Sequence, residues 1–453
     1  MEEEGFIIVP REGDEDHLSN LRGSQDDDSS GFMSDIDAFI SDIEEPLWAL
    51  NTFIHANPEL AFQEHKAHRA LTEFVRLQGQ DWRVTPSAYG METAWVAVYD
   101  SGQRGPVVSF NVEMDALPGL GHACGHNLIA IASTAAGLAT AETMKRHRLP
   151  GKVVLFGTPG EEGYDGGKIR LLKQGAYQGV DISLISHPGI LHNSPLVRTT
   201  AFTRLEVEYF GRAAHGAKNP WMGINALDAL VIAYNSVSVL RQQTMSGDTI
   251  GLAITNGGER ATNIIHAYSA CVCMLHATSA SRLDALQRKV SACFRAGAEA
   301  TGATVKINIT PGYQDHVPNR VLAASYATYW NLLPDPPNPP IPLPKEGNQQ
   351  LTWVTSSTDQ GDLSHAMPSV NASFAIPPGP EGGQPHSPDF EMASGTKPAF
   401  MRALRVGKAL AGTAVDVLAR PGFVDEVKKQ WKRDMEATDG LLYQYFPTLD
   451  SAH

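Results

Sequence analysis

The chain has 453 residues, of which 42% are hydrophobic, and it carries a formal net charge of −14 at pH 7. At about 100–200 residues per domain, this length predicts two or three domains with enough apolar residues for substantial cores. The acidic balance argues against a nucleic-acid-binding protein, because such proteins neutralise phosphates with a surplus of Lys and Arg.

The N-terminal segment 1–33 is expected to be an acidic, disordered tail. Residues 1–31 contain ten acids and two bases, which gives this short stretch a net charge of −8. A highly charged segment with few apolar residues cannot bury enough surface to offset the entropy lost on folding. We interpret the tail as solubilising rather than as a binding motif.

Sequence features that would direct the chain to a membrane or out of the cell are missing. No run reaches the roughly 18 apolar residues of a membrane-spanning helix. The start of the sequence has neither the basic segment nor the apolar core of a signal peptide. The cysteines, Cys124, Cys271, Cys273 and Cys293, are too few and too clustered for a disulfide framework. We therefore expect a soluble, cytoplasmic protein.

The first half of the chain alternates between helical and strand-like patterns. A helical pattern covers 35–77, with an interruption at Asn57-Pro58. An Ala- and Gly-rich helix is expected at 128–146, and a short helix begins near Lys168. Strand-like runs occur at 93–99, 106–112, 152–157 and 181–186. This order predicts an α/β domain with a mainly parallel sheet and helices on both faces.

Residues 197–311 have a different pattern and predict an inserted domain. Strands are expected at 204–210, 249–254, 268–276 and 304–310, with helices at 224–241 and 281–299. The order β-α-β-β-α-β is the ferredoxin-like plan, which takes roughly 100 residues. Cys271 and Cys273 are two apart on one strand and are expected to pack on its face.

The α/β pattern resumes after the inserted domain. A helix is expected at 319–333, a strand near 371–376 and an amphipathic helix at 397–418, and the Pro-rich stretch 334–344 is interpreted as a surface loop. The expected organisation is therefore a catalytic domain formed by 34–196 and 312–420, the insertion 197–311, and a C-terminal extension, 421–453.

Side chains that can bind metal follow successive strands of the predicted sheet. They are Glu113, Asp115, Cys124, His126, Glu161, Glu162 and His187, joined by His386 in the loop 377–390. In open α/β sheets, ligands gather at the carboxyl ends of the strands, so we expect these groups to meet at one edge. Imidazole, thiolate and carboxylate together suit a divalent ion, most naturally zinc, with manganese or cobalt as alternatives.

The adjacent pair Glu161-Glu162 indicates hydrolysis. One carboxylate can hold a metal while its neighbour takes a proton from the water bound to that metal, which then attacks a polarised carbonyl. Alone, a His-x-Cys-x-His turn is more often structural, and a Glu-Glu pair is more often a solvated loop. Their combination after successive strands favours metal-dependent amide hydrolysis. The sequence contains neither a Gly-x-Ser-x-Gly elbow nor a Walker phosphate loop, so serine hydrolases and nucleotide triphosphatases lack their usual support.

Several motifs resemble a known family. They are HANPEL at 55–60, EMDALPGLGHACGHN at 113–127, GTPGEEG at 157–163, GRAAHG at 211–216, TNII at 262–265, STD at 357–359 and PHSPDF at 385–390. In this order they resemble the aminoacylase/carboxypeptidase-type metallopeptidase family 20. The similarity is greatest to its amidohydrolase branch, which includes auxin-conjugate hydrolases and aminobenzoyl-glutamate hydrolases.

The resemblance implies a site of one or two metal ions and a role for each matching residue. The implied ligands are Cys124, His126, Glu162, His187 and His386. Glu161 matches the general base, and Asp115 matches an aspartate that orients a ligand. His215 matches a histidine that stabilises the oxyanion, and Asn263 matches a residue that contacts substrate. The inserted domain is then expected to be both a lid and the interface of a homodimer.

Three positions depart from the common pattern of the family, and one of them is His266, which replaces the usual proline after Asn-Ile-Ile. Glu113 stands where many relatives outside this branch have a histidine ligand, which leaves occupancy of a second metal position open. His276 lies thirteen residues after Asn263, where many relatives have an arginine that holds the substrate carboxylate. An imidazole binds an anion more weakly than a guanidinium does, and only when it is protonated.

Three functions remain open at this point. The leading hypothesis is a metal-dependent amidase or dipeptidase that acts on a small N-acyl amino acid or dipeptide-like substrate. The second is a biosynthetic enzyme that forms or trims an amide of a secondary metabolite at the same site. The third is a non-catalytic binding protein, against which the retention of both glutamates and every expected ligand counts.

Overall fold

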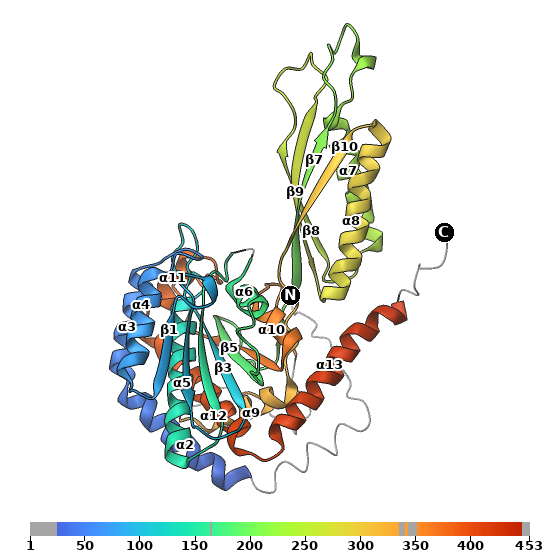
Figure 1. The fold of residues 1–453 in the computed structure, drawn as a ribbon. Coiled ribbons are helices and arrows are strands. Elements are labelled where there is room, and N and C mark those ends of the chain that lie inside the picture. The colour runs from blue at the N-terminus through green and yellow to red at the C-terminus, as the bar shows by residue number, and fades with distance from the viewer. Residues whose placement is uncertain (1–24, 164, 335–339, 343–350, 446–453) are drawn as a thin grey trace. The chain divides into compact units, whose positions relative to one another are not determined.

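The computed structural model describes residues 25–163, 165–334, 340–342 and 351–445, which form two compact units (Figure 1). The first unit comprises the described residues up to Arg198 together with 317–353 and 362–434. The second comprises 199–316, 354–361 and the described residues after 434.

Part of the expected N-terminal tail is helical. Residues 1–24 lie outside the described residues, but helix α2 spans Gln25–Asp42, so the prediction of disorder up to residue 33 is wrong from Gln25 onward. The physical reason is an apolar face at helical spacing, because Met33, Ile36 and Ile40 are all buried in the core of the first unit.

The first unit contains a six-stranded sheet with the strand order β1-β2-β4-β3-β5-β12. The strands are β1 Trp82–Pro86, β2 Trp95–Asp100, β3 Val107–Glu113, β4 Lys152–Thr158, β5 Ile182–Gly189 and β12 Ser369–Ala375. β3 is parallel to β4 and β5, and β12 is parallel to β5, whereas β1 and β2 join the edge as antiparallel strands. This confirms the mainly parallel sheet predicted from the sequence.

Helices cover both faces of this sheet, as strand β4 demonstrates. Val153 and Leu155 face a large hydrophobic core, whereas Val154 and Phe156 face a smaller one. The large core contains residues of α2, α3 Glu44–Ala56, α4 His65–Leu77, α5 His126–His147, α9 Arg320–Leu332, α12 Lys397–Ala419 and α13 Phe423–Tyr445. The smaller core includes Leu171 of α6 Gly167–Lys173 and Leu363 of α10 Gln360–Ala366.

Helix α5 is buried on almost every side, which explains its composition. Because a Cβ at Gly137 would lie 2.5 Å from Cδ2 of Leu155, this helix packs too closely on β4 for a larger residue there. Its first residue is His126, so the rigid packing of the helix also fixes the position of that side chain. None of the described helices combines the length and apolar character needed to cross a bilayer.

The second unit has the ferredoxin-like plan. Its elements are β7 Ala201–Phe210, α7 Ala226–Val239, β8 Thr249–Asn256, β9 Tyr268–Ala277, α8 Ala280–Thr301 and β10 Thr304–Pro311. The sheet order is β10-β7-β9-β8 with every neighbouring pair antiparallel, which confirms the predicted β-α-β-β-α-β arrangement. Cys271 and Cys273 are buried in its core, as expected, and all four cysteines of the chain are free.

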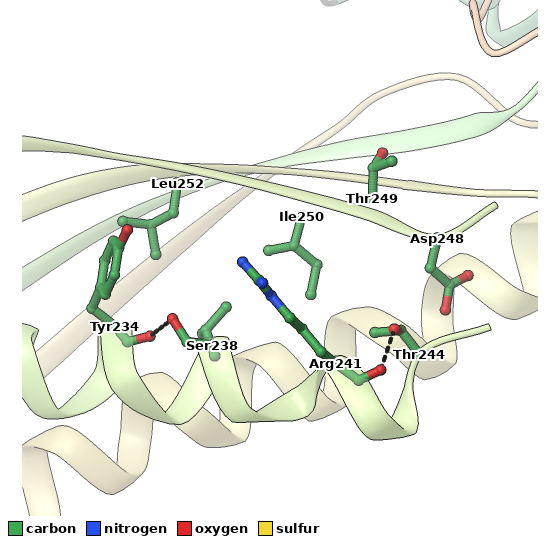
Figure 2. A pocket seen from close by; sticks show the side chains of 9 residues that line it. Tyr234, Ser238, Arg241, Thr244, Asp248, Thr249, Ile250 and Leu252 are labelled. Carbon is green, nitrogen blue, oxygen red and sulfur yellow. Dashed lines mark hydrogen bonds between the residues drawn. The ribbon is translucent and has the colours of Figure 1, made fainter. Parts of the chain in front are cut away.

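A cavity of about 470 Å³ lies at one edge of the second unit (Figure 2). It is lined by Tyr234 and Ser238 of α7, by Arg241 of the 3₁₀ helix η4 (Leu240–Gln243), and by Ile250 and Leu252 of β8. β8 is the edge strand of the four-stranded sheet, and four of its last five residues are at the surface or nearly so. The cavity therefore opens beside a strand edge that pairs with no other described strand.

Several short elements complete the fold. They are the 3₁₀ helices η2 Ala88–Gly90 and η3 Pro220–Met222, helix α11 Pro388–Ser394, and the strands β6 Val197–Arg198 and β11 Thr352–Trp353, which pair in parallel. The sequence analysis did not predict β1, α10, α11 or α13, and it read α2, α3 and α4 as one interrupted helix. Most of the Pro-rich stretch 334–344 lies outside the described residues.

Candidate metal centre

The carboxyl ends of β3, β4 and β5 bring the expected ligand side chains together. Glu113 is the last residue of β3, and His187 lies near the end of β5. The turn before α5 depends on Gly125, which has a φ of +75° and lies where a Cβ would come within 2.5 Å of Cγ of Pro188. Cys124 and His126 flank this glycine, so the tight turn places both near the same strand ends.

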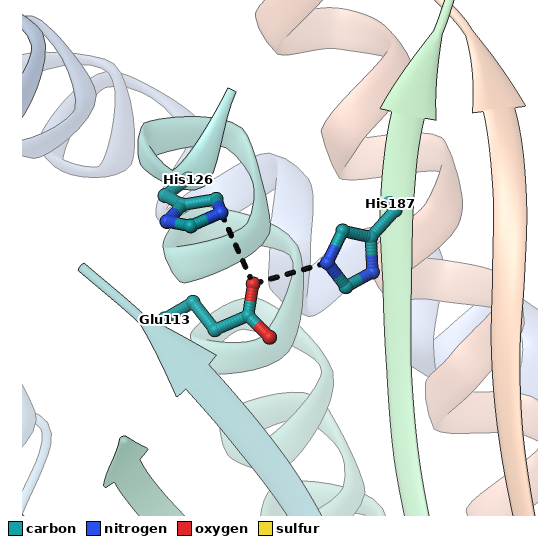
Figure 3. Close-up of side chains that lie close together, drawn as sticks. All are labelled: Glu113, His126 and His187. Atoms are coloured by element: carbon teal, nitrogen blue, oxygen red, sulfur yellow. Dashed lines mark ion pairs between the residues drawn. The ribbon is translucent and has the colours of Figure 1, made fainter. Parts of the chain in front are cut away.

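One group of ligand atoms consists of Glu113, His126 and His187 (Figure 3). Oε2 of Glu113 lies 3.4 Å from Nε2 of His126 and 3.2 Å from Nε2 of His187. A ligand atom from each residue lies within 4.8 Å of the other two. Figure 3 shows both imidazole rings directed at the same carboxylate oxygen.

A second group consists of Cys124, His126 and Glu162, whose ligand atoms also lie within 4.8 Å of one another. His126 therefore belongs to both groups. His386 joins this side of the site, because its Nε2 lies 3.2 Å from Oε1 of Glu162. The backbone N–H of His386 donates to the carbonyl of Ala123 over 2.8 Å, which holds its loop against the Cys124 turn. Four of the five expected ligands thus lie in the two groups, and His386 lies beside the second group.

Hydrogen bonds on the outer side of the rings orient the imidazoles. Nδ1 of His126 lies 3.0 Å from Oδ1 of Asp115, and Nδ1 of His187 lies 2.7 Å from Oδ1 of Asn371. With each Nδ1–H donating outward, the neutral form of each ring would present the lone pair of Nε2 toward the carboxylate of Glu113. Neutral rings in this orientation repel the carboxylate oxygen, whereas a positive charge between them, from protons or from a shared metal ion, makes the contact attractive.

The unsatisfied atoms of the site fit a divalent metal ion. Oε2 of Glu113, Nε2 of His126, Nε2 of His187 and Oε1 of Glu162 are buried and have no hydrogen-bond partner among the described residues. Leaving a buried polar atom unpaired costs about 1–3 kcal/mol each. Four such atoms in one place, beside the thiol of Cys124, make a donor set of nitrogen, oxygen and sulfur that suits a borderline-soft divalent cation.

Charges around the site are strongly coupled. Burial alone would raise the pKa of Glu113, but Lys168 and His187 hold it well below its ordinary value. Nζ of Lys168 lies 2.5 Å from Oε1 of Glu113, and both side chains are fully buried. Burial alone would lower the pKa of His126, but Cys124 and Asp115 raise it well above its ordinary value. The surroundings of His126 therefore favour positive charge at this point.

Burial raises the pKa of the Cys124 thiol well above its ordinary value, and the carboxylate of Glu162 adds to the shift. A thiol is a metal ligand only as the thiolate, so Cys124 needs a cation beside it to lose its proton. Binding of a metal ion at Cys124 would therefore release a proton.

Glu161 lies next to the two groups that share His126, although it is a member of neither. Its side chain is buried, and its Oε2 is 3.8 Å from Nε2 of His126. The backbone N–H of its neighbour Glu162 donates to Oδ2 of Asp115 over 2.9 Å. Asp115 therefore contacts both a ring of the site and the backbone beside Glu161.

The remaining expected site residues, His215, Asn263 and His276, belong to the second unit. Nδ1 of His215 accepts hydrogen bonds from the N–H groups of Ala217 and Lys218, each 3.2 Å long, so the ring proton is on the exposed Nε2. The carbonyl of Asn263 accepts from the N–H of Gly216 over 2.7 Å, which places the loops of His215 and Asn263 side by side.

His276 lies on β9 and stacks against Phe202, with ring centroids 5.6 Å apart. Burial lowers the pKa of His276, so its ring is neutral over most of the physiological range. A neutral imidazole cannot form an ion pair with a carboxylate. Any contact from this position to an anionic substrate is then a hydrogen bond rather than a salt bridge.

Three residues in or beside the site were not assigned a role from the sequence. Lys168 was noted only as the start of a short helix. Asn371 and Glu64 carry no local motif, since their partners are far away along the chain. The one local signal was Lys168 itself, which directly follows Gly166-Gly167 and is close in sequence to Glu161-Glu162. This signal did not identify Glu113 as the partner of the lysine.

No family model matches the chain, but individual proteins and solved structures do. The chain is 38% identical to the Xaa-Arg dipeptidase of Mus musculus over 87% of this chain and 90% of that protein, and 36% identical to the Xaa-Arg dipeptidase of Homo sapiens over 88% and 91%. The fold matches a dinuclear metal-binding peptidase of the M20 family from Bacillus subtilis with a TM-score of 0.60 at 17% identity, over 83% of this chain and 99% of that one.

Proposed function

The chain belongs to the M20 family of metallopeptidases and amidohydrolases, and on that premise we propose how its residues perform the hydrolysis of an amide bond. It is a metal-dependent hydrolase of peptide or amide bonds. The observation that carries the proposal is the pair of ligand groups that share His126, with Glu161 beside them.

We propose Cys124, His126, Glu162, His187 and His386 as the metal ligands and add Glu113 to them. Two groups with one shared member favour two ions, with Glu113 and His187 at one and Cys124 and Glu162 at the other. Zinc is the proposed metal because the donor set includes a thiolate and imidazoles, with manganese and cobalt as the alternatives.

Bound metal would polarise the substrate carbonyl and make the attacking water more acidic. Glu161 accepts a proton from that water and returns it to the nitrogen of the leaving amine, so that water and amide become acid and amine. Asp115 keeps the ring of His126 and the backbone of Glu162 in place during this transfer. His215 donates its Nε2–H to the oxygen that becomes negative as the tetrahedral intermediate forms.

The substrate is proposed to be a small dipeptide or N-acyl amino acid. Relatives that match most of this chain are named for dipeptides ending in arginine, so dipeptides with a basic C-terminal residue are the first class to test. Asn263, on the loop beside His215, is proposed to contact the substrate, and His276 is proposed to hydrogen-bond to it. Both residues belong to the second unit, which supplies specificity rather than the metal.

A homodimer through the second unit is part of the proposal. β8 is an edge strand, and α7 beside it exposes Val231 and Tyr234, each 45% exposed. A row of unpaired backbone groups next to exposed apolar side chains is a surface that a second copy can cover by strand pairing. An Ile254→Lys substitution, on the same strand, is expected to give a monomer in light scattering, and an unchanged mass would contradict this interface.

The cytoplasm is the proposed location. All four cysteines are free, and one of them is a proposed metal ligand whose thiolate has to stay reduced. Expression of a fluorescent fusion followed by fractionation would test it, and recovery in an oxidising compartment would contradict it.

The experiment that tests the reaction compares the wild type with Glu161→Gln. Both are loaded with zinc and given a panel of Xaa-Arg dipeptides and N-acyl amino acids, and matched acids and amines are tested for the reverse reaction. We expect the wild type to cleave at least one amide and the variant to lose about 10²–10⁴-fold in kcat with its metal content intact. Equal rates would remove Glu161 as the base, and no turnover by either protein would favour a binding role.

A further inference from the structure

Two backbone N–H groups, one on each side of Glu161, are held by buried carboxylates. The N–H of Glu162 donates to Oδ2 of Asp115 over 2.9 Å, and the N–H of Gly160 donates to Oε1 of Glu64 over 2.8 Å. Asp115 also holds a ring of the metal centre, but Glu64 contacts neither that ring nor another expected ligand in the contacts described. Its position therefore needs an explanation of its own.

We propose that Glu64 is a positioning residue for the reaction, which holds the loop of the general base Glu161 through the backbone of Gly160. The proposal rests on the function proposed above, because it concerns the placement of the base. Glu64 forms no hydrogen bond with an expected metal ligand, so its effect is expected to act through the backbone of this loop.

Glu64 joins three segments that are far apart in the sequence. It is the residue before α4, it is fully buried, and its Oε2 accepts from the hydroxyl of Thr93 over 2.7 Å. Its Oε1 accepts from the N–H groups of both Phe62 and Gly160, each over 2.8 Å. One carboxylate thus fixes the start of α4, the chain before β2 and the loop after β4 in one geometry.

The loop after β4 is pressed against the segment that carries Glu64. Gly160 has a φ of +70°, and a Cβ there would lie 2.5 Å from Cε2 of Phe62. Phe62 itself has a φ of +62°, which is uncommon for a bulky residue. Such a conformation persists only where the surroundings hold it, and the shared Oε1 of Glu64 is the group that holds both backbones.

Burying a charged carboxylate at this position lowers the free energy of unfolding, which argues against a role limited to filling space. Burial raises the pKa of Glu64 to about 7, and the nearby charge of Asp115 adds to the shift. An apolar residue of similar size would avoid this penalty but would leave two buried N–H groups and one hydroxyl without an acceptor. What the carboxylate provides is a fixed backbone beside Glu161, and catalytic rates are sensitive to such placement.

The test compares Glu64→Leu with Glu64→Gln in the zinc-loaded full chain. Leucine removes the acceptor for Gly160, and we expect kcat to fall about 10–100-fold with KM within about twofold and the metal content unchanged. Glutamine keeps an oxygen for Phe62 and Gly160, and its amide can donate to Thr93, so we expect kcat within about threefold of the wild type.

Glu59→Ala is the matched control. The Glu59 side chain accepts from the N–H groups of Lys66 and Ala67, so its loss weakens the start of the same helix without touching Gly160. We expect it to lower the melting temperature and leave kcat unchanged. A kcat of Glu64→Leu equal to that of the wild type, or a loss in kcat as large in Glu59→Ala, would overturn the proposal.

Two further measurements keep the proposal testable. If Glu64→Leu does not fold, Thr93→Val removes only the hydroxyl that holds Oε2, and we expect it to lower kcat about 3–10-fold at constant KM. If the wild type cleaves no amide, the proposed function has failed. Hydrogen exchange of the peptide 157–163 then decides this inference, because faster exchange in Thr93→Val or Glu64→Leu at constant metal content supports it and unchanged exchange overturns it.

Discussion

The two sheets of this protein are covered by packed side chains to different degrees. The sheet that is covered on both faces carries the candidate metal ligands. The sheet of the first unit has a hydrophobic core on each face, and its strand ends hold buried, hydrogen-bonded polar groups. The sheet of the second unit has one core, and its functional candidates His215 and Asn263 lie on exposed loops. In the proposed mechanism, the chemistry that needs fixed geometry lies on the doubly covered sheet, and the proposed substrate contacts lie on the more open one.

The largest effect is expected from His126→Ala, because this ring belongs to both ligand groups. We expect the variant to lose most of its bound metal and at least about 10³-fold in kcat, measured by elemental analysis and an amidase assay. His192→Ala, an exposed histidine of the same unit, serves as the control and should keep both. Full metal content in His126→Ala would show that the ligand groups do not act as one centre.

The next largest effect concerns the buried ion pair of the first unit. Lys168→Met leaves the carboxylate of Glu113 buried without its cationic partner, so the chelated protein should lose about 3–5 kcal/mol in its free energy of unfolding. Zinc should restore part of this loss because it supplies positive charge beside the same carboxylate. Urea unfolding with and without zinc measures both the loss in the free energy of unfolding and its recovery by zinc. A loss below about 1 kcal/mol, the value of an exposed ion pair, would contradict the claim that Lys168 stabilises the buried carboxylate of Glu113.

The pH dependence of stability tests the buried carboxylate network. The pKa of Glu64 is raised from 4.5 to about 7, so the folded state holds its proton more tightly than the unfolded chain does. Its contribution to stability is therefore present below about pH 4.5 and is lost as the pH rises through about 7. We compare the free energies of unfolding of Glu64→Gln and the wild type in the presence of a chelator. As the pH rises from about 4.5 to about 7, the variant should become more stable relative to the wild type by roughly 3 kcal/mol. A pH-independent difference between the two proteins would contradict the shift.

The smallest effect is expected in the second unit. His276→Arg replaces a neutral ring with a permanent cation, and we expect the KM for substrates with a free carboxylate to fall about tenfold, with kcat within about twofold. Amide substrates that lack the carboxylate are the control and should show no gain. A change in kcat rather than in KM would contradict the proposal that the second unit contributes to substrate binding and the first unit to catalysis.

Most of the architecture could be predicted from the sequence because the periodic patterns are strong. The parallel strands around α5 and the β-α-β-β-α-β order of the second unit both follow from runs of apolar residues. Edge strand β1 was missed, since its five residues, WRVTP, are mostly exposed and contain a proline. Helix α13 was missed because its apolar face is short, with Phe423 and Val427 as its buried residues in the core.

The sequence predicted the candidate ligands and one supporting residue, Asp115, but not the other supporting residues. Cys124, His126, Glu162 and His187 follow strands, so a topological rule brings them to one edge. Lys168, Asn371 and Glu64 act through partners 55, 184 and 96 residues away along the chain. No local pattern encodes such contacts, and the direction in which each side chain points is set only when the sheet and its helices pack.

The central claim is that the two groups sharing His126 hold metal, and diffraction at the zinc absorption edge tests it most directly. In crystals of the zinc-loaded protein, we expect anomalous density bonded to Nε2 of His126, with Cys124 and Glu162 or Glu113 and His187 as the other ligands. A strong anomalous peak bound elsewhere, with these side chains hydrogen-bonded only to one another, would contradict it.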